Sequence, residues 1–326
     1  MNKRIDYFDM LRGVAIIFVI ICHSYSGDPL SGSFKDELYL LIRQIVTCAV
    51  PIFLALSGFF LANKVLANTK DYFYFWTTHS FRVWLPMVIW SIPLFFIREH
   101  DNPVISIIYL LLGGYSIYYF ITLIIQYYAM QPLFRKINKF GAVLCTIITA
   151  LFLIADNYYT SIQGHHLSLF FECAPFVMWL AYPALGYYIS KNGRNYRVYP
   201  WLIIMFISLI CCIFESKWLY SFHGGGLGAT KLSSLFFSAS AIFVLLSEKA
   251  QKKLVFNTHW YKSLVYIGEI SFGIYLIHKF FLDFLIAPLV KDTLIRTLLT
   301  LVLSITFIAI IKKIMPKFAS RYLGFR

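Results

Sequence analysis

The sequence predicts an all-α, polytopic integral membrane helical bundle that forms a single membrane-embedded domain over residues 1–326. Of its 326 residues, 60% are hydrophobic and only 13% are charged, whereas about a quarter are charged in soluble domains. The mean hydropathy is +0.71, and apolar runs of bilayer-spanning length recur along the chain. These observations exclude a soluble globular domain and a disordered chain.

Run length and helix breakers define the predicted elements, because segments that are apolar all round show no readable periodicity. The chain has about ten predicted spans, at roughly 7–25, 38–62, 73–97, 115–134, 141–156, 171–190, 199–215, 229–247, 261–283 and 294–314. No small-residue cleavage site follows the first, so we expect an uncleaved helix. The run at 103–112, between Pro103 and Gly113, is too short to span and predicts a re-entrant or interfacial helix.

The distribution of basic residues predicts the orientation of these spans. With the N-terminus inside, the inner segments hold nineteen Lys and Arg residues, the outer segments hold six and the spans hold four. Because Lys and Arg collect in cytoplasmic loops, we expect both termini in the cytoplasm. The net charge of +14 then belongs to these loops, and we expect no nucleic-acid partner.

The cysteines and the glycine-rich segment give weak functional signals. All six cysteines lie in or beside apolar runs, without a C-x-x-C or a Cys/His spacing typical of zinc, so we expect small buried side chains and no metal site. The sequence HGGGLG, within the outer loop at 216–228, follows no strand and matches no phosphate-binding loop. We interpret it as a mobile loop.

Ionisable residues at the ends of the first apolar run are the main functional signal. Arg12 and His23 are eleven residues apart, which on a helix means roughly 16 Å along the axis and an offset of about 20°. Both side chains therefore share one face, and Asp9 lies one turn before Arg12, close enough to pair with it. A snorkelling anchor at Arg12 and an interfacial histidine at the helix end are the alternatives.

Further candidates lie in three other spans. Charged groups within a span usually face the bundle interior or a water-filled cavity. The candidates are Arg43 near the outer end of the second span, Arg82 near the inner end of the third, and Glu269, Tyr275 and His278 in the ninth. Helix-end anchoring and packing are the alternative roles for these residues.

Four short motifs occur in a distinctive order. They are FDMLRGVAIIFVIICHS with Asp9, Arg12, Gly13 and His23, VPIFLALSGFFL with Pro51, Phe53, Ser57 and Gly58, FRVWLP with Arg82, and ISFGIYLIH with Ser271, Tyr275 and His278. Together they resemble the membrane-bound acyltransferase family 3, whose members O-acylate bacterial surface sugars. The chain departs from the family at His79, where many members carry arginine, and matches the family's aromatic cluster only loosely at Tyr118 and Tyr119.

The resemblance implies a multi-pass protein of the bacterial cytoplasmic (inner) membrane with His23 as its catalytic residue. It also implies a cytoplasmic acyl-CoA donor, acetyl-CoA in an O-acetyltransferase, and a sugar or polysaccharide acceptor. We expect no bound cofactor. Arg12 and Arg82 suit the donor's phosphates, Asp9 orients Arg12, and Tyr275 is a candidate oxyanion donor. Arg43, His278 and Glu269 are candidates for the acceptor site.

Two questions of mechanism and function stay open at this point. His23 suits a general base, and it also suits a transient acyl carrier. The charged face would equally serve a transporter or flippase of a lipid-linked sugar or acyl donor, although no internal repeat is evident. A non-catalytic scaffold or sensor gives no reason for Arg12 and His23 to share a face.

Overall fold

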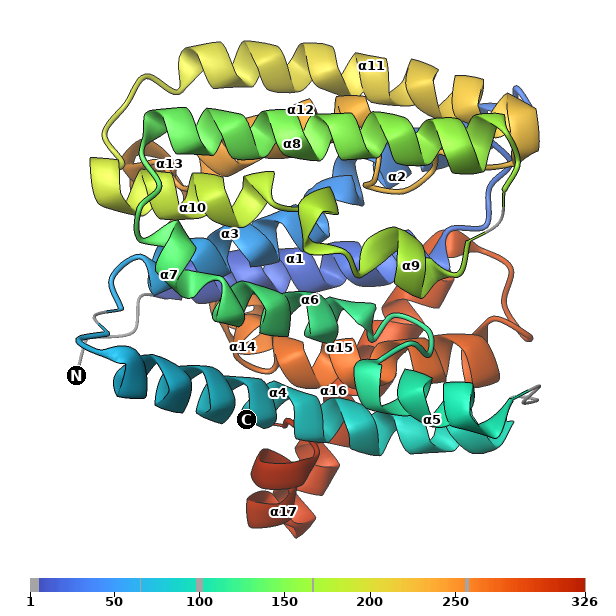
Figure 1. Cartoon of the computed structure of the whole chain (residues 1–326). Coiled ribbons are helices and arrows are strands. Elements are labelled where there is room, and N and C mark those ends of the chain that lie inside the picture. The colour runs from blue at the N-terminus through green and yellow to red at the C-terminus, as the bar shows by residue number, and fades with distance from the viewer. Residues whose placement is uncertain (1–5, 65, 98–101, 166, 256–257, 326) are drawn as a thin grey trace.

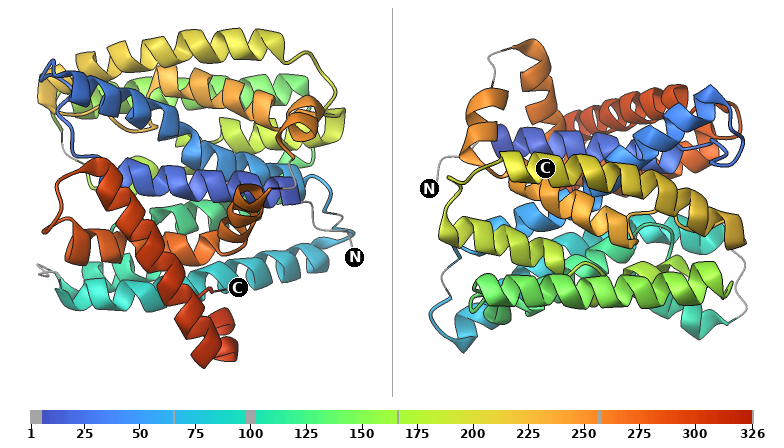
Figure 2. Two further views of the ribbon diagram at one scale, coloured as in Figure 1. Left: turned by 180° about the vertical axis from the view of Figure 1, so that it is seen from behind. Right: turned by 90° about the horizontal axis from the view of Figure 1, so that it is seen from above.

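A computed structural model describes residues 6–64, 66–97, 102–165, 167–255 and 258–325. All regular structure in these residues is helical, as predicted. Most helices lie side by side in one bundle (Figure 1), and in the view from behind α16 crosses in front of α1 at a steep angle (Figure 2, left). Four of the basic residues that were counted to predict the orientation lie outside the described residues: Lys3, Arg4, Arg98 and Arg326.

Six helical segments of the described chain are long and apolar enough to cross a membrane, and a bent pair adds a seventh. The six are α1 (Asp6–Ser24), α2 to α3 (Phe34–Leu61), α4 (Thr69–Ile97), α8 with η2 (Lys139–Ile162), α11 (Tyr199–His223) and α16 (Thr293–Ile314). The pair is α12 (Leu232–Leu245) and α13 (Glu248–Leu254), bent by 70°. These segments correspond to seven of the ten predicted spans.

The other three predicted spans are also helical, but each consists of shorter pieces. They contain α6 (Tyr119–Ala129) and α7 (Gln131–Phe134); α9 (Leu169–Cys173), η3 (Phe176–Met178) and α10 (Ala181–Asn192); and α14 (His259–Glu269), α15 (Ser271–Phe281) and η4 (Leu282–Ile286). Pro132 and Pro175 lie at the breaks in the first two, where the missing N–H interrupts the helical hydrogen bonds. The last helix, α17 (Pro316–Tyr322), follows α16.

The second predicted span is a single crossing with a break near its middle. It consists of α2 (Phe34–Ile45), a 3₁₀ turn η1 (Val46–Cys48) and α3 (Ala49–Leu61). Pro51 lies in the first turn of α3, where the missing N–H of proline is tolerated. Proline also disfavours an α-helical conformation in the residue before it, which favours a break at this point. The 3₁₀ turn therefore divides this crossing into two helices, α2 and α3.

Burial divides the spans into a central and a peripheral set. Over the most apolar 18 residues of each segment, 61% of the residues are buried in α1 and 67% in the α2–α3 segment. The corresponding shares are 17% in α4, 17% in α8 and 22% in α11. The exposed side chains of the peripheral helices are largely apolar; Phe206 is 65% exposed and Leu298 61%. Such surfaces suit lipid, so α1 and α3 form the interior of a membrane bundle.

The predicted short helix at 103–112 is confirmed with the same bounds, as α5 (Pro103–Leu112). The Asn102 side chain accepts hydrogen bonds from the first turn, at Val104 N (2.9 Å) and Ile105 N (3.3 Å), and Pro103 occupies the first turn. Gly113 ends the helix with φ of +71°, in the left-handed region that glycine adopts readily.

Direct backbone contact joins α1 to α14. A Cβ at Gly13 would collide with the carbonyl oxygen of Leu264, and a Cβ at Gly268 would collide with that of Asp9. Small residues permit such close helix crossings in membranes. Both glycines are therefore needed where α1 crosses α14.

A second glycine pair joins α3 to α10 in the same way. A Cβ at Gly58 would meet the carbonyl of Pro183, and a Cβ at Gly186 would meet that of Ala55. The second motif of the sequence thus contains a glycine for a packing reason. The two crossings hold both central helices, α1 and α3, against their neighbours.

Replacing Gly13 by alanine is expected to destabilise the bundle by about 1–3 kcal/mol, the usual cost of overpacking a filled interior. The measurement is the thermal unfolding midpoint in detergent. Gly141→Ala is the matched control, because the nearest atom to its Cβ would be Asn138 Oδ1 at 3.6 Å, an ordinary contact. Equal midpoints for the two variants would contradict a backbone contact at Gly13.

Candidate functional site

Two cavities meet at His23. The first, which we name the Arg12 cavity, has a volume of about 370 Å³ and extends from Arg12 to His23 between α1, α3, α4, α6 and α15. The second, the loop cavity, has a volume of about 380 Å³ and lies between His23 and the glycine-rich loop 224–230. Four residues line both cavities: Val19, His23, Val50 and Tyr119. His23 therefore faces both spaces at their junction.

Arg12, at the end of its cavity opposite His23, forms an ion pair with the buried Asp9. Arg12 Nη1 donates to Asp9 Oδ1 at 2.6 Å, and Asp9 is only 1% exposed. The Arg12 guanidinium also lies over the Phe60 ring, 5.1 Å from its centroid, a cation–π contact. The structure confirms that Asp9 pairs with Arg12 and that Arg12 and His23 share one face of α1.

The wall of the Arg12 cavity is held by two tyrosine hydrogen bonds to backbone. Tyr275 Oη donates to Ile117 O, and Tyr118 Oη donates to Leu276 O at 2.7 Å. These reciprocal bonds fix the start of α6 against α15. Tyr275 lines the cavity, but its hydroxyl proton is committed to a backbone carbonyl. Tyr119 lines both cavities.

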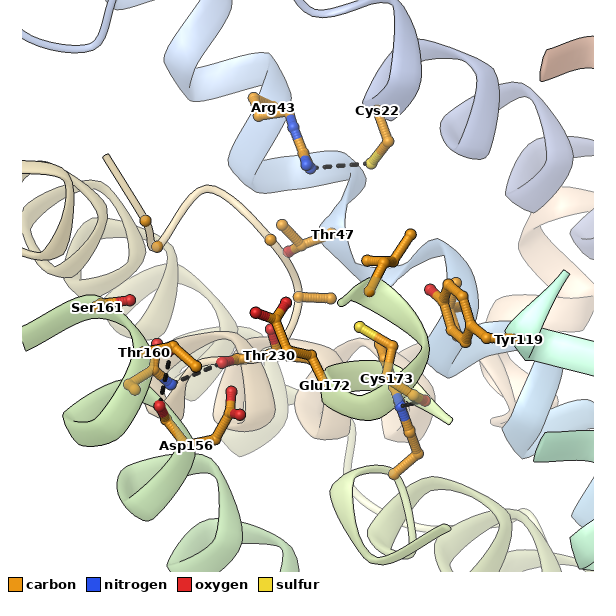
Figure 3. Close-up of a pocket in the computed structure, with 18 of the residues that line it drawn as sticks. Cys22, Arg43, Thr47, Tyr119, Asp156, Thr160, Ser161, Glu172, Cys173 and Thr230 are labelled. Carbon is orange, nitrogen blue, oxygen red and sulfur yellow. Dashed lines mark hydrogen bonds between the residues drawn. The ribbon is translucent and has the colours of Figure 1, made fainter. Parts of the chain in front are cut away.

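Polar groups from several elements surround the loop cavity, as Figure 3 shows. Arg43 Nη1 donates to Cys22 Sγ at 3.0 Å. Asp156 from α8 and Glu172 from α9 bring two carboxylates to the same space, together with the hydroxyl groups of Thr160 and Thr230. Carboxylates and hydroxyls form strong hydrogen bonds to the hydroxyls of a bound ligand, so this cavity suits a polyhydroxylated molecule.

The glycine-rich loop, which the sequence predicts to be mobile, makes several hydrogen bonds to neighbouring helices. Asn157 Nδ2 donates to Thr230 O at 2.7 Å, and Ser216 Oγ donates to Gly226 O at 3.0 Å. Lys231 Nζ donates to Gln44 Oε1 at 2.6 Å and to Gly228 O at 3.0 Å. These bonds hold the loop against α2, α8 and α11, where Gly224, Gly225 and Gly226 line the cavity.

The other sequence candidates are dispersed. Arg43 lies in the loop cavity. Arg82 lies apart from both cavities, in an exposed hollow that it shares with Arg321, while its neighbour Val83 lines the Arg12 cavity. Glu269 is exposed at the end of α14 and lines neither cavity. His278 is fully buried beside His23, with ring centroids 5.5 Å apart.

Sequence reasoning missed much of the loop cavity. Asp156 and Glu172 are the charged residues of the predicted spans 141–156 and 171–190, and a charged group within a span was the available signal. Lys231 lies in the predicted span 229–247 and is 0% exposed. His165 and His223 also line the cavity.

One family model matches the chain. It describes an acyltransferase domain and covers residues 5–313, nearly the whole sequence. No curated protein and no solved structure matches the chain. The matched range includes every residue that lines the two cavities described above.

Proposed function

The chain belongs to the acyltransferase 3 family, and from this premise we propose that it is a membrane O-acyltransferase, an acetyl-CoA-dependent O-acetyltransferase. In this proposal the acyl-CoA enters from the cytoplasm into the Arg12 cavity, and a hydroxyl of a cell-surface sugar or polysaccharide precursor occupies the loop cavity. The observation that carries the proposal is that His23 lines both cavities. A residue there reaches both reactants, as a general base must.

The donor fits the Arg12 cavity by charge and length. Coenzyme A is anionic at its nucleotide end and carries its thioester at the far end of a narrow arm. Arg12 would hold a phosphate in a charge-assisted hydrogen bond, while the arm follows α1 toward His23, roughly 16 Å away. The nucleotide is too large for the same cavity, so we place it over the neighbouring surface, where Arg82 and Arg321 line a hollow.

The reaction at the junction moves one proton and exchanges one bond. The sugar oxygen attacks the thioester carbonyl carbon while a His23 ring nitrogen takes the hydroxyl proton. The C–S bond then breaks, and the CoA thiolate leaves with that proton. A route through an acyl-histidine uses the same residue as nucleophile, with the acyl group passing from sulfur to nitrogen and then to the sugar oxygen.

The oxyanion that forms during attack needs a nearby hydrogen-bond donor. Tyr119 lines both cavities and is therefore the best placed tyrosine. Tyr275 lines the Arg12 cavity alone. Each tyrosine would first have to release its present partner, Cys173 for Tyr119 and Ile117 O for Tyr275. We assign the oxyanion contact to Tyr119 and keep Tyr275 as the second candidate. The separate variants Tyr119→Phe and Tyr275→Phe distinguish the two, because the variant that lacks the oxyanion contact loses more kcat.

The acceptor follows from the lining of the loop cavity. Asp156 and Glu172 accept hydrogen bonds, Arg43 donates them, and Thr160 and Thr230 do both. This mixture suits a sugar with several hydroxyl groups. It does not suit an apolar acceptor, since the carboxylates would then lie buried and without solvation.

Replacing His23 by alanine is expected to lower acyl transfer by about 10²–10⁴-fold, the usual contribution of a general base. The measurement is transfer of labelled acetyl from acetyl-CoA in proteoliposomes, with mass spectrometry of surface polysaccharide from cells with and without the chain. His259→Ala, an exposed histidine, is the matched control. Full transfer by the His23 variant would contradict the mechanism, and movement of a sugar without acylation would favour a flippase.

Replacing Arg12 by glutamine is expected to raise the KM for acyl-CoA by about 10- to 100-fold with a small change in kcat. This corresponds to the roughly 1.5–3 kcal/mol of a hydrogen bond to a charged group. Arg197→Gln, at an exposed basic residue that lines neither cavity, serves as control. An unchanged KM would show that Arg12 does not hold the donor.

Replacing Val50 by phenylalanine is expected to lower kcat by about tenfold or more, since the added ring would occupy the junction and displace the reacting groups. Steady-state kinetics in proteoliposomes provide the measurement. Val302→Phe on α16, where the valine is 50% exposed, adds the same ring on the lipid-facing surface. Equal kcat values for both variants would show that the reaction does not pass between the cavities.

A further inference from the structure

A second histidine lies beside His23 without facing either cavity. His278 on α15 is 0% exposed, and its ring lies 5.5 Å from that of His23, centroid to centroid, at an interplanar angle of 37°. A ring nitrogen lies about an ångström from its centroid, so two facing nitrogens at this separation come within hydrogen-bond reach. The two rings do not share a hydrogen bond in the described residues, since His278 Nε2 has no partner there, but a small turn of the rings toward each other would form one.

Backbone contacts define the tautomer of His278. Its Nδ1 lies 2.8 Å from Tyr275 O and 3.1 Å from Ile274 O. Both partners are carbonyl oxygens, which only accept, so Nδ1 carries the proton. In the neutral ring Nε2 is then a hydrogen-bond acceptor.

This acceptor is buried and unused. Within the described part of the chain, His278 Nε2 has no hydrogen-bond partner. A buried polar atom in that state costs free energy, so its retention needs an explanation. Catalytic hydrogen bonds are often incomplete without substrate and tighten when the substrate binds.

The donors beside His278 on α15 and at the start of α6 already have acceptors. Tyr275 and Tyr118 donate their hydroxyl protons to Ile117 O and Leu276 O. Lys279 Nζ donates to Asp283 Oδ1 at 2.7 Å. His23 is the neighbouring ring with a nitrogen that can donate, and it is also the residue at the junction of the cavities.

We infer that His278 is a positioning residue, whose Nε2 accepts a ring N–H of His23 and so directs the other His23 nitrogen, as a lone pair, toward the reacting hydroxyl. The inference rests on the proposed function. When His23 takes the hydroxyl proton, the N–H shared with His278 stays in place, and the CoA thiolate later removes the proton that was gained. His278 thus serves His23 and not the acceptor.

Two amide substitutions separate this role from simple packing. In His278→Asn the amide lies near the former Nδ1 and can still donate to the backbone carbonyls, but no acceptor replaces Nε2. In His278→Gln the longer side chain places an amide oxygen near the former Nε2. The measurements are kcat and KM for acetyl-CoA in proteoliposomes, and the unfolding midpoint in detergent.

We expect His278→Asn to lower kcat by about tenfold or more with KM unchanged, and His278→Gln to restore most of that loss. Wild-type kcat in the Asn variant would overturn the inference and leave the proposed function standing. Equal losses of kcat and stability in both variants would also overturn it, since packing would then explain His278. A wild-type chain that transfers no acyl group would remove the proposed function and this inference together.

Discussion

The backbone contact between α1 and α14 is the constraint on which the arrangement of the site depends. Gly13 and Gly268 leave no room for a side chain between the two helices, so the rotation of α1 about its own axis is fixed. With that rotation fixed, Arg12 and His23 both line the cavity on the same side. The contact between α3 and α10 at Gly58 and Gly186 fixes the facing wall, which includes Val50 and Ser57.

The polarity of the two cavities differs in a way that suits two different ligands. Between Arg12 and His23 the lining is mostly apolar and aromatic, which suits the narrow arm of the proposed acyl donor. Beyond His23 the lining becomes polar and charged. The anchored loop closes this polar cavity through Lys231, Asn157 and Ser216. One bundle thereby presents two environments to a single histidine.

The sequence predicted the parts of this arrangement that depend on local spacing. Run lengths located the helical segments, the i, i+3 spacing predicted the Asp9–Arg12 pair, and the helix period predicted that Arg12 and His23 share a face. The loop cavity was not predictable in the same way. Asp156, Glu172 and Arg43 come from three distant elements, and helices that are apolar all round give no sign of which face turns inward. The burial of Lys231, at the start of α12, was not predictable either, since lysines are rarely fully buried.

The central claim is that an acyl group passes between the two cavities at His23. The most direct measurement uses sealed proteoliposomes of the intact chain, with labelled acetyl-CoA added outside and the sugar acceptor trapped inside. The account predicts acetylated acceptor in the lumen while the vesicles remain impermeable to acetyl-CoA. Product that forms only when donor and acceptor are on the same side of the membrane would contradict it.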